Sequence, residues 1–469
     1  MPVLALFLLP GCSFVPTYQR PDVPMAQSWA GAAQAPLADT VPVRSGWWRA
    51  YGDPNLDTLV ERSLKHNFSL ASAVASVDQA RANAERSGAA LYPSLSLGAS
   101  VERGGKKSGG SSSHGQSLFA EASYEIDFWG RNSANANAAS LLARASEFDR
   151  DTVALTLTAS VTDTYFQIQG LRRRLVLAQA ISDAAAHILQ LLLAQRDAGV
   201  ATELQVQQQR NALATFQAAV PVLQQQLEQS THLLATLAGT APGQFAAGEA
   251  PLNSIPIPQA RPDIPASLLE TRPDIRSKEA ALQSANFSVG AARAAFFPSI
   301  VLTADGGFSS TSLSRLLSSP FGTIASTLAA PILDGGALRG QLHANQAAVA
   351  KGVADYRQTV VTALQDVEDA LSAARQLQLA ETADQAAADA ARKAVTLAEA
   401  QYKLGTVDFL TVLDTERTLY QAEDTLAQVR LQRLQASVGL FRAFGGGEGV
   451  TDMPAAPASR DNPSNPTLS

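Results

Sequence analysis

The chain carries one internal duplication with a period near 206 residues, and this repeat limits what it can fold into more than any other feature. Aligning Gly405 with Gly199 gives an offset of 405 − 199 = 206. Three phrases occur in both halves: "LYPSLSL" at 91–97 and "FFPSIVL" at 296–302, "DFWGR" at 127–131 and "DGGALR" at 334–339, "QRDAGVATELQVQQQR" at 195–210 and "YKLGTVDFLTVLDTER" at 402–417. Solenoid repeats are far shorter, at ~20–50 residues. Each half should therefore be a whole structural layer, and the two halves should share one architecture.

Each half contains a pair of segments in which apolar and polar residues alternate, the period of two that is typical of β-strands. They are 91–102 and 117–128 in the first half, and 296–308 and, less cleanly, 323–333 in the second. A Gly- and Ser-rich loop joins the two members of each pair. The sequence thus predicts one β-hairpin in each half.

These strands are the expected route across a membrane, if the protein crosses one. No segment after the N-terminal run offers the ~18–20 uninterrupted apolar residues of a membrane-spanning helix, whereas ~9–11 residues suffice for a tilted strand. Leu97 and Ile126 lie on the apolar face, and Ser96 and Glu125 lie on the polar face. Hydrocarbon does not tolerate the open edges of four strands. Either the strands form an ordinary soluble sheet, or several chains pool them, three chains giving twelve strands.

Long helices surround the hairpins. Two runs contain no proline and few glycines: Asn132 to about Gln195, and about Gly336 to Lys403. At 1.5 Å per residue, each run predicts a helix ~100 Å long. Further helices are expected before each hairpin, over 54–88 and 272–294, and as return helices, over roughly 201–237 and 407–443. Such rods disfavour a compact soluble enzyme, and a solitary coiled-coil scaffold would have no use for strands between its helices.

Composition excludes several classes of function. The net charge is −6 and no basic stripe is present, so nothing indicates a nucleic-acid partner. The five histidines are scattered and the chain has one cysteine, so no metal-ligand spacing can be written. "GGKKSGG" at 104–110 lacks the following helix of a phosphate-binding loop. We expect no catalytic residues, metal or cofactor.

The N-terminal run "MPVLALFLLPGC" ends in the single cysteine and resembles a bacterial lipobox. It predicts a signal peptide over 1–11 and lipid attachment at Cys12. Pro10 is unusual at its position, and no Lys or Arg precedes the run. Ser13 after the cysteine is similar to lipoproteins sorted to the outer membrane. The alternative is a free, unmodified cysteine.

The twice-written order of helix, strand hairpin, long helix, turn and return helix resembles the TolC/OprM outer-membrane factor family. Three internal motifs carry the resemblance: "TRPDIRSKEAAL" at 271–282, "FFPSI" at 296–300 and "YKLGTVDFLTVLDTERTLYQAEDTL" at 402–426. The segment "CSFVPTYQRPDVP" at 12–24 is similar to the NodT-like lipoprotein branch. The resemblance implies a mixed membrane protein: a homotrimer with four strands per chain in a twelve-stranded β-barrel, continued by a long periplasmic α-helical barrel.

The same resemblance implies the function of an outer-membrane exit duct of a tripartite efflux pump, which passively exports small molecules such as drugs or toxic compounds. The implied partners are a periplasmic adaptor protein, an inner-membrane pump of the RND type and the lipid of the outer membrane. The protein would be palmitate-anchored and would extend into the periplasm. A cell-envelope scaffold or a component of a protein-secretion conduit is the alternative.

The expected layout follows from these assignments. It consists of the signal peptide 1–11, an N-terminal lipoprotein segment 12–53, a first repeat 54–238 with its hairpin at 91–128, a Pro-rich connector 239–270, a second repeat 271–445 with its hairpin at 296–333, and a disordered tail 446–469.

In the family, the turns that contain Gly199 and Gly405 lie at the periplasmic tip, where the second one narrows the bore. The resemblance implies that four residues hold this gate closed: Leu410, Asp414, Arg417 and Tyr402. The first three are four and three residues apart and share one helical face. The alternative is that Leu410 is interhelical core and that Asp414 and Arg417 form an exposed pair worth ~0.2–0.5 kcal/mol.

Two positions near the gate depart from the family pattern. Val407 and Thr411 stand where the relatives carry an arginine and a second aspartate, which leaves a second acidic ring in question. In the first repeat the equivalent places are held by Leu204, Gln208 and Asn211, so that tip carries no charge of this kind.

Overall fold

The computed structural model describes residues 13–30, 40–41, 45–104, 113–260 and 264–446. The chain divides into two compact units. Unit 1 consists of Met1–Val23, Ala75–Asp149 and Asp274–Thr359, and unit 2 of Pro24–Val74, Arg150–Pro273 and Val360–Ser469. The predicted signal peptide, Cys12 and all but the first residue of the predicted tail 446–469 lie outside the described residues.

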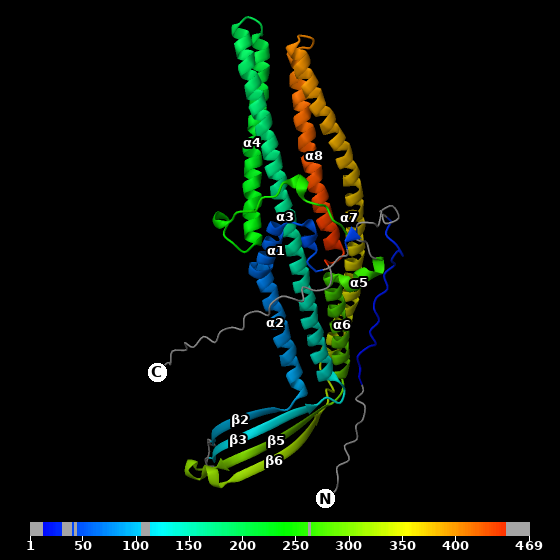
Figure 1. Cartoon of the computed structure of the whole chain (residues 1–469). Coiled ribbons are helices and arrows are strands. Elements are labelled where there is room, and N and C mark those ends of the chain that lie inside the picture. Colours follow the sequence, from blue (N-terminus) through cyan, green and yellow to red (C-terminus); the bar gives the residue numbers. More distant parts are fainter. Residues whose placement is uncertain (1–12, 31–39, 42–44, 105–112, 261–263, 447–469) are drawn as a thin grey trace. The chain divides into compact units, whose positions relative to one another are not determined.

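Unit 1 contains a four-stranded antiparallel sheet with the order β2-β3-β5-β6, seen in Figure 1. The strands are β2 Ser94–Gly104, β3 Ser113–Ile126, β5 Ser299–Ser310 and β6 Pro320–Ala329. Both predicted hairpins are confirmed, and β3 of the first pairs with β5 of the second. In each half a proline, Pro93 or Pro298, immediately precedes the first strand, because proline cannot continue a helix and favours extended chain before it.

The fourth strand does not occupy the predicted range 323–333, and this expectation is wrong at both ends. Strand β6 ends at Ala329, and Ile332 and Leu333 beyond it are 91% and 94% exposed. Pro331 has no N–H to give to the ladder, so the strand stops before it.

The register divides the sheet into two faces, as predicted. Residues directly opposite one another share a face. One row across the four strands is apolar: Leu95, Ala122, Ala304 and Ile324. The next row is polar: Ser96, Glu121, Asp305 and Thr323. Leu97 and Ile126 belong to the apolar face, and Ser96 and Glu125 to the polar face.

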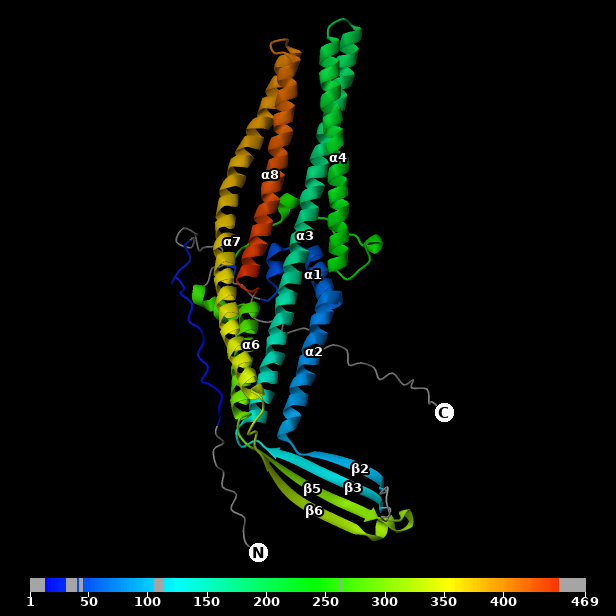
Figure 2. The same cartoon turned by 180° about the vertical axis from the view of Figure 1, so that it is seen from behind.

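The helices repeat with equal lengths in the two halves. Helix α3, Arg131–Asp197, and helix α7, Ala337–Lys403, each have 67 residues. Helix α4, Glu203–Leu237, and helix α8, Phe409–Ala443, each have 35. Within unit 2, α4 runs back along α3 and α8 along α7 in both views (Figures 1 and 2). The duplicated unit and the ~100 Å rods are confirmed.

An aspartate of the repeated phrases lies a few residues before each long helix and binds its first turn. Asp127 accepts hydrogen bonds from the backbone N–H groups of Asn132 and Ser133, at 2.9 and 2.7 Å. Asp334 accepts from those of Gly336 and Leu338, at 2.9 and 2.7 Å. The first N–H groups of a helix lack intrahelical partners, and a carboxylate at this place satisfies two of them.

The single helix expected over 54–88 is wrong. The structure has α1 at Pro54–His66 and α2 at Phe68–Gly88, separated by Asn67 in an extended conformation. The Asn67 side chain accepts from Leu70 N at 3.0 Å, and its amide donates to the Leu237 carbonyl at 3.0 Å. Asn67 therefore caps a new helix instead of continuing the first.

The predicted connector 239–270 is tied to the helices of unit 2 by arginines. Arg172 of α3 donates to the carbonyls of Ala247 and Gly248, at 3.0 and 2.6 Å. Arg430 of α8 donates to the Ile255 carbonyl at 2.7 Å. The connector thus passes from α3 to α8. It then forms strand β4, Gln259–Ala260, which pairs in parallel with β1, Thr40–Val41, before helices α5, Leu268–Thr271, and α6, Pro273–Ala294.

By length and hydropathy alone, one described helix, α3, could cross a membrane, with a mean hydropathy of 1.5 over its most apolar window. Packed core helices pass the same test. Helix α3 contributes Leu171 and Leu192, each 1% exposed, to apolar clusters with α4 and α8.

Candidate functional site

The glycines of the two predicted tip turns lie in left-handed turns of unit 2. Gly199 has φ +76° and Gly405 has φ +72°, conformations that residues with a β-carbon rarely adopt. After each glycine, a backbone N–H reaches back to a glutamine carbonyl at the end of the long helix: Val200 to Gln195 at 2.8 Å, and Thr406 to Gln401 at 3.0 Å. This pattern ends a helix and reverses the chain.

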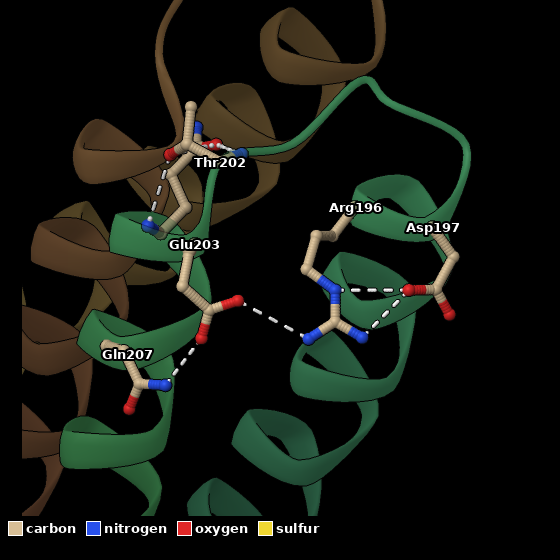
Figure 3. A network of polar contacts seen from close by, with 6 residues as sticks. Arg196, Asp197, Thr202, Glu203 and Gln207 are labelled. Carbon is tan, nitrogen blue, oxygen red and sulfur yellow. Dashed lines mark hydrogen bonds and ion pairs between the residues drawn. The ribbon is translucent and has the colours of Figure 1, made fainter.

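In the first tip, at Gly199, charged side chains pair across the turn (Figure 3). Arg196 contacts Asp197 at 2.8 Å and reaches across the turn to Glu203 at 3.4 Å. Gln207 donates to the other Glu203 oxygen at 2.6 Å. Thr202 and Gln205 form a capping box at the start of α4. Because these pairs are exposed to solvent, each stabilises the turn only weakly.

The second tip, at Gly405, is built differently. Asp408 caps α8 by accepting from Thr411 N at 2.9 Å and from Thr411 Oγ1 at 2.7 Å, and these bonds lower the Asp408 pKa. Thr411, which replaces the second aspartate of the family pattern, thus serves the helix cap. Among the described residues no ion pair crosses this turn, whereas an ion pair crosses the turn of the first tip.

The predicted gate residues on α8 face away from the chain's own core. Leu410 is 55% exposed, and Asp414 and Arg417 are also exposed. Within the described part of the chain, no hydrogen bond or ion pair joins the side chains of Asp414 and Arg417. Within the single chain, Leu410 is therefore not part of the buried core between helices. At the equivalent place in the first repeat, Leu204 is 68% exposed.

Tyr402 differs from the other three because it bonds within the chain. Its hydroxyl donates to Gln195 Oε1 at 3.2 Å, which ties the end of α7 to the end of α3. Its ring lies 5.9 Å from that of Phe409, which is 2% exposed. Tyr402 therefore links the two repeats next to both tip turns.

Sequence reasoning missed a second link between the repeats. Arg174 of α3 donates to both carboxylate oxygens of Asp424 on α8, at 2.6 and 3.1 Å, and Gln428 donates to the same carboxylate at 2.6 Å. Nearby, Phe216 of α4 meets Tyr420 of α8 edge to face at 5.7 Å. No local pattern marks these residues, because their partners lie on other helices.

Glu416 is a buried carboxyl on α8 that lies between Asp414 and Arg417 in the sequence, both of which are exposed. It is 4% exposed, and its Oε2 has no hydrogen-bond partner among the described residues. Burial, and secondarily the charge of Glu399, raise the Glu416 pKa to about 7. A carboxyl in such a place is neutral at mildly acid pH and becomes a buried charge above neutrality.

We expect Glu416→Gln to remove a pH dependence of stability. Because the pKa is raised in the folded state, the Glu416 contribution is complete below its ordinary value of 4.5 and is lost as pH rises through about 7. The variant should therefore unfold at a higher temperature than wild type at about pH 8, with little difference at about pH 5. Thermal denaturation followed by circular dichroism in detergent measures this. An equal shift at both pH values would contradict it.

A metal-binding group is likewise absent from the described residues. They contain no group of three His, Cys, Asp or Glu side chains that could hold a metal ion. On the polar face of the sheet, Glu125 is paired with Arg131, with both carboxylate oxygens 2.7 Å from Nη2. The candidate site therefore consists of the two-faced sheet of unit 1 and the two helix–turn–helix tips of unit 2.

Comparison with known proteins agrees with this arrangement. The chain matches the profile of the outer membrane efflux protein family over residues 59–240 and 264–446, which are the two repeats. It is 36% identical over 456 residues to the pyoverdine export outer membrane protein OpmQ of Pseudomonas aeruginosa, covering 95% of this chain and 96% of that protein. It is 32% identical over 455 residues to the probable efflux pump outer membrane protein TtgC of Pseudomonas putida, covering 94% of each. The solved structure of the outer-membrane channel OprN superposes with a TM-score of 0.85 at 30% identity, covering 92% of this chain and 98% of that one.

Proposed function

This chain belongs to the outer membrane efflux protein family, and from that premise we propose that it is the outer-membrane exit duct of a tripartite efflux pump. It acts as a passive channel for small molecules between the periplasm and the exterior. A periplasmic adaptor and an inner-membrane transporter of the RND type complete the pump. The transporter supplies the energy, since the duct has only to provide a path.

The observation that carries this proposal is the sheet of unit 1. Its apolar face is open to the surroundings, with Leu97 78% exposed and Ile324 88% exposed, while the opposite face is mostly polar and includes Phe119 and Phe321. A soluble sheet would cover such a face with a helix or a second sheet. An apolar outer face and a polar inner face are the pattern of a membrane barrel that encloses water.

The sheet also supports a trimer. In its order β2-β3-β5-β6, the outer edges of β2 and β6 have no partner among the described strands. An open edge is not tolerated in hydrocarbon. Since neighbouring strands are antiparallel and four is even, β6 of one copy can pair antiparallel with β2 of the next. Three copies then close a twelve-stranded barrel.

The helices of the trimer would continue the barrel as a periplasmic tunnel that ends at the Gly199 and Gly405 turns. Three-fold symmetry makes each gate residue a ring of three. Leu410 would form a dewetting constriction, and Asp414 a collar that attracts cations. Arg417 would pair with Asp414 between neighbouring copies, because the two do not bond within one chain. Tyr402, bonded to Gln195, would hold the two repeats together at the closed tip.

The cargo is set by the pump and not by the duct. The name of one relative describes pyoverdine export and that of another, from Pseudomonas putida, a toluene efflux pump, although each aligns with nearly the whole of this chain. Ducts of one architecture thus serve different cargoes. The exported compounds should therefore follow the inner-membrane transporter that this protein meets.

Purification and reconstitution test the proposed function directly. We expect trimers that resist detergent until heated, and discrete ion-conducting steps in planar bilayers. Trimers that bind membranes without conducting would favour a cell-envelope scaffold. Monomers that remain in solution would contradict the membrane assignment.

We further propose that Cys12 carries the lipid anchor. It ends the apolar run "MPVLALFLLPGC", which resembles a lipobox. Labelled palmitate should enter the wild type and not the Cys12→Ser variant, because serine lacks the thiol through which the acylated glycerol of a lipoprotein anchor is attached. Both proteins should still form trimers, since the barrel supplies its own membrane affinity. Equal labelling of the two would remove the lipobox assignment.

A further inference from the structure

Helix α8 carries two rows of side chains that run next to each other. The first row recurs at steps of four, three and four residues and so lies along one face of the helix: Phe409, Leu413, Glu416 and Tyr420. Each residue of the second row, the gate row, directly follows a member of the first: Leu410, Asp414 and Arg417. Successive residues of an α-helix are rotated by ~100°, so the gate row lies beside the first row. Any movement of the first row therefore moves the gate row with it.

The first row packs against the other repeat. Phe409 and Leu413 are 2% and 6% exposed and belong to an apolar cluster with α3 and α4, and Tyr420 packs against the same cluster. The buried members from α3 and α4 are Ala185, Leu192, Val206, Ala212 and Phe216. We call this contact between α8 and the first repeat the seam. Because the two rows share one helix, loosening the seam frees the gate row to change position.

The seam contains two buried polar side chains with unpartnered oxygens. Glu416 is 4% exposed, and its Oε2 accepts no hydrogen bond from any described residue. Gln209, which is 0% exposed, lies three residues after the buried Val206 on the same face of α4. Its Nε2 donates to the Ala185 carbonyl at 2.8 Å, whereas its Oε1 has no partner in the described part of the chain. Both unpartnered atoms are acceptors, so a proton on Glu416 supplies a donor that the ionised carboxylate lacks.

The helices around Glu416 offer it no compensating positive charge. On α7 the charge that acts on it is that of Glu399, which is exposed and has the same sign. The side chains that α3 and α4 place in the apolar cluster are uncharged. The other titratable groups around the seam are exposed (His187 and Arg210), tyrosine hydroxyls (Tyr402 and Tyr420) or members of an ion pair (Arg174 and Asp424). Within the described residues, no cation pairs with Glu416.

We propose that Glu416 is a proton-operated latch for the tip. With a proton on its carboxyl, the seam stays packed and the gate row stays closed; without the proton, α8 separates from the first repeat and the gate row opens. The inference rests on the proposed function, in which α8 lines the end of a channel. An ionised carboxylate is costly in an apolar seam and becomes hydrated once the seam loosens. The closed and open states thus bind the proton with different affinities, which shifts their populations.

The pH range of the latch follows from the direction of the pKa shift. Burial, and secondarily the charge of Glu399, raise the Glu416 pKa to about 7 in the packed seam, against an ordinary value of 4.5. The packed seam is therefore favoured in full below 4.5, and this preference is lost as pH rises through about 7. We expect the closed-to-open ratio to fall roughly tenfold or more between about pH 5 and about pH 7.5.

The open fraction of single trimers in planar bilayers tests the latch at about pH 5 and about pH 7.5. The open fraction is scored instead of the size of the current step, because carboxylates that line the lumen also change the step size with pH. Wild type should be open more often at the higher pH. Glu416→Gln keeps the shape of the side chain but cannot ionise, so it should stay mostly closed at both. A rise in Glu416→Gln equal to that of wild type would overturn the inference.

Two exposed glutamates provide variants that leave the packing of the seam intact. Glu228→Gln on α4 removes the same charge away from the first row and should keep the full rise of wild type. Glu399→Gln removes a charge that helps to raise the Glu416 pKa, so the rise should be smaller and should end at a lower pH. Loss of the rise in Glu228→Gln would overturn the assignment to Glu416.

Two further outcomes separate the latch from the proposed function. An open fraction that does not change with pH, in wild-type trimers that conduct, would overturn the latch and leave the proposed function intact. Inserted trimers that conduct at neither pH would count against the proposed function itself.

Discussion

Replacing Leu410 with alanine should raise the single-channel conductance of the reconstituted trimer. In the single chain this side chain is 55% exposed, so its contacts in the proposed trimer are with the other copies across the axis. Alanine widens the apolar ring and removes contacts that only the closed state makes. A loss of ~1–2 kcal/mol from the closed state changes the closed-to-open ratio by roughly 5–30-fold.

The first repeat provides the matched control. Position 410 − 206 = 204 is also a leucine, and Leu204 is 68% exposed on α4. Leu204→Ala removes the same atoms from the other tip and should leave conductance unchanged. An equal rise in both variants would contradict a gate specific to the second repeat. No rise for Leu410→Ala, in trimers shown to be inserted, would return Leu410 to the role of packing between copies.

Asp414→Ala should act in the same direction. It removes the negative collar and frees Arg417 from a partner that we place in the neighbouring copy. Asp414→Ala/Arg417→Ala should add little to Asp414→Ala alone, because members of one network are not additive. Entry of a large antibiotic such as vancomycin into cells provides a second measurement. Additive effects would mean that the two residues do not interact.

Arginine at Leu97 should destabilise the membrane-inserted protein by ~2–4 kcal/mol if the residue lies near the middle of the bilayer. Leu97 lies on the apolar face of β2, opposite Ala120, and its side chain is 78% exposed. A charge there would face hydrocarbon. Urea denaturation in lipid vesicles, followed through the loss of the heat-modifiable form, measures the change. Arginine at Ile126 should also destabilise the membrane-inserted protein.

Ser96→Arg is the control for this prediction. Ser96 neighbours Leu97 on the same strand but points to the polar face, so arginine should be tolerated as a change in the water-filled lumen. Glu125 lies on the same polar face but is a poorer control, because its ion pair with Arg131 would be lost as well. A reversed pattern, with Ser96→Arg costly and Leu97→Arg tolerated, would turn the proposed barrel inside out.

The candidate site was predictable in part. The sequence correctly placed Gly199 and Gly405 in turns, because a left-handed backbone is a local requirement that glycine meets. It also placed Leu410, Asp414 and Arg417 on one face of α8, because helical periodicity is local. It did not reveal that Asp414 and Arg417 remain unbonded within the chain, or that Thr411 caps the helix with Asp408. Side-chain rotamers and caps depend on neighbours that periodicity does not specify.

The sequence by itself determined the elements and their repetition. Strand alternation, proline-free runs of equal length and the glycine turns each act within a few residues. These predictions held for the kind and order of the elements, but the strand ends shifted by a few residues and Asn67 began a new helix. Only the tertiary structure decided how distant parts are joined. Arg20 and Glu279 are 259 positions apart, Arg174 and Asp424 are 250 apart, and Tyr402 and Gln195 are 207 apart. Such bonds leave no periodic pattern in the sequence, because they form only after packing has brought separate helices and the N-terminal segment Ser13–Val23 side by side.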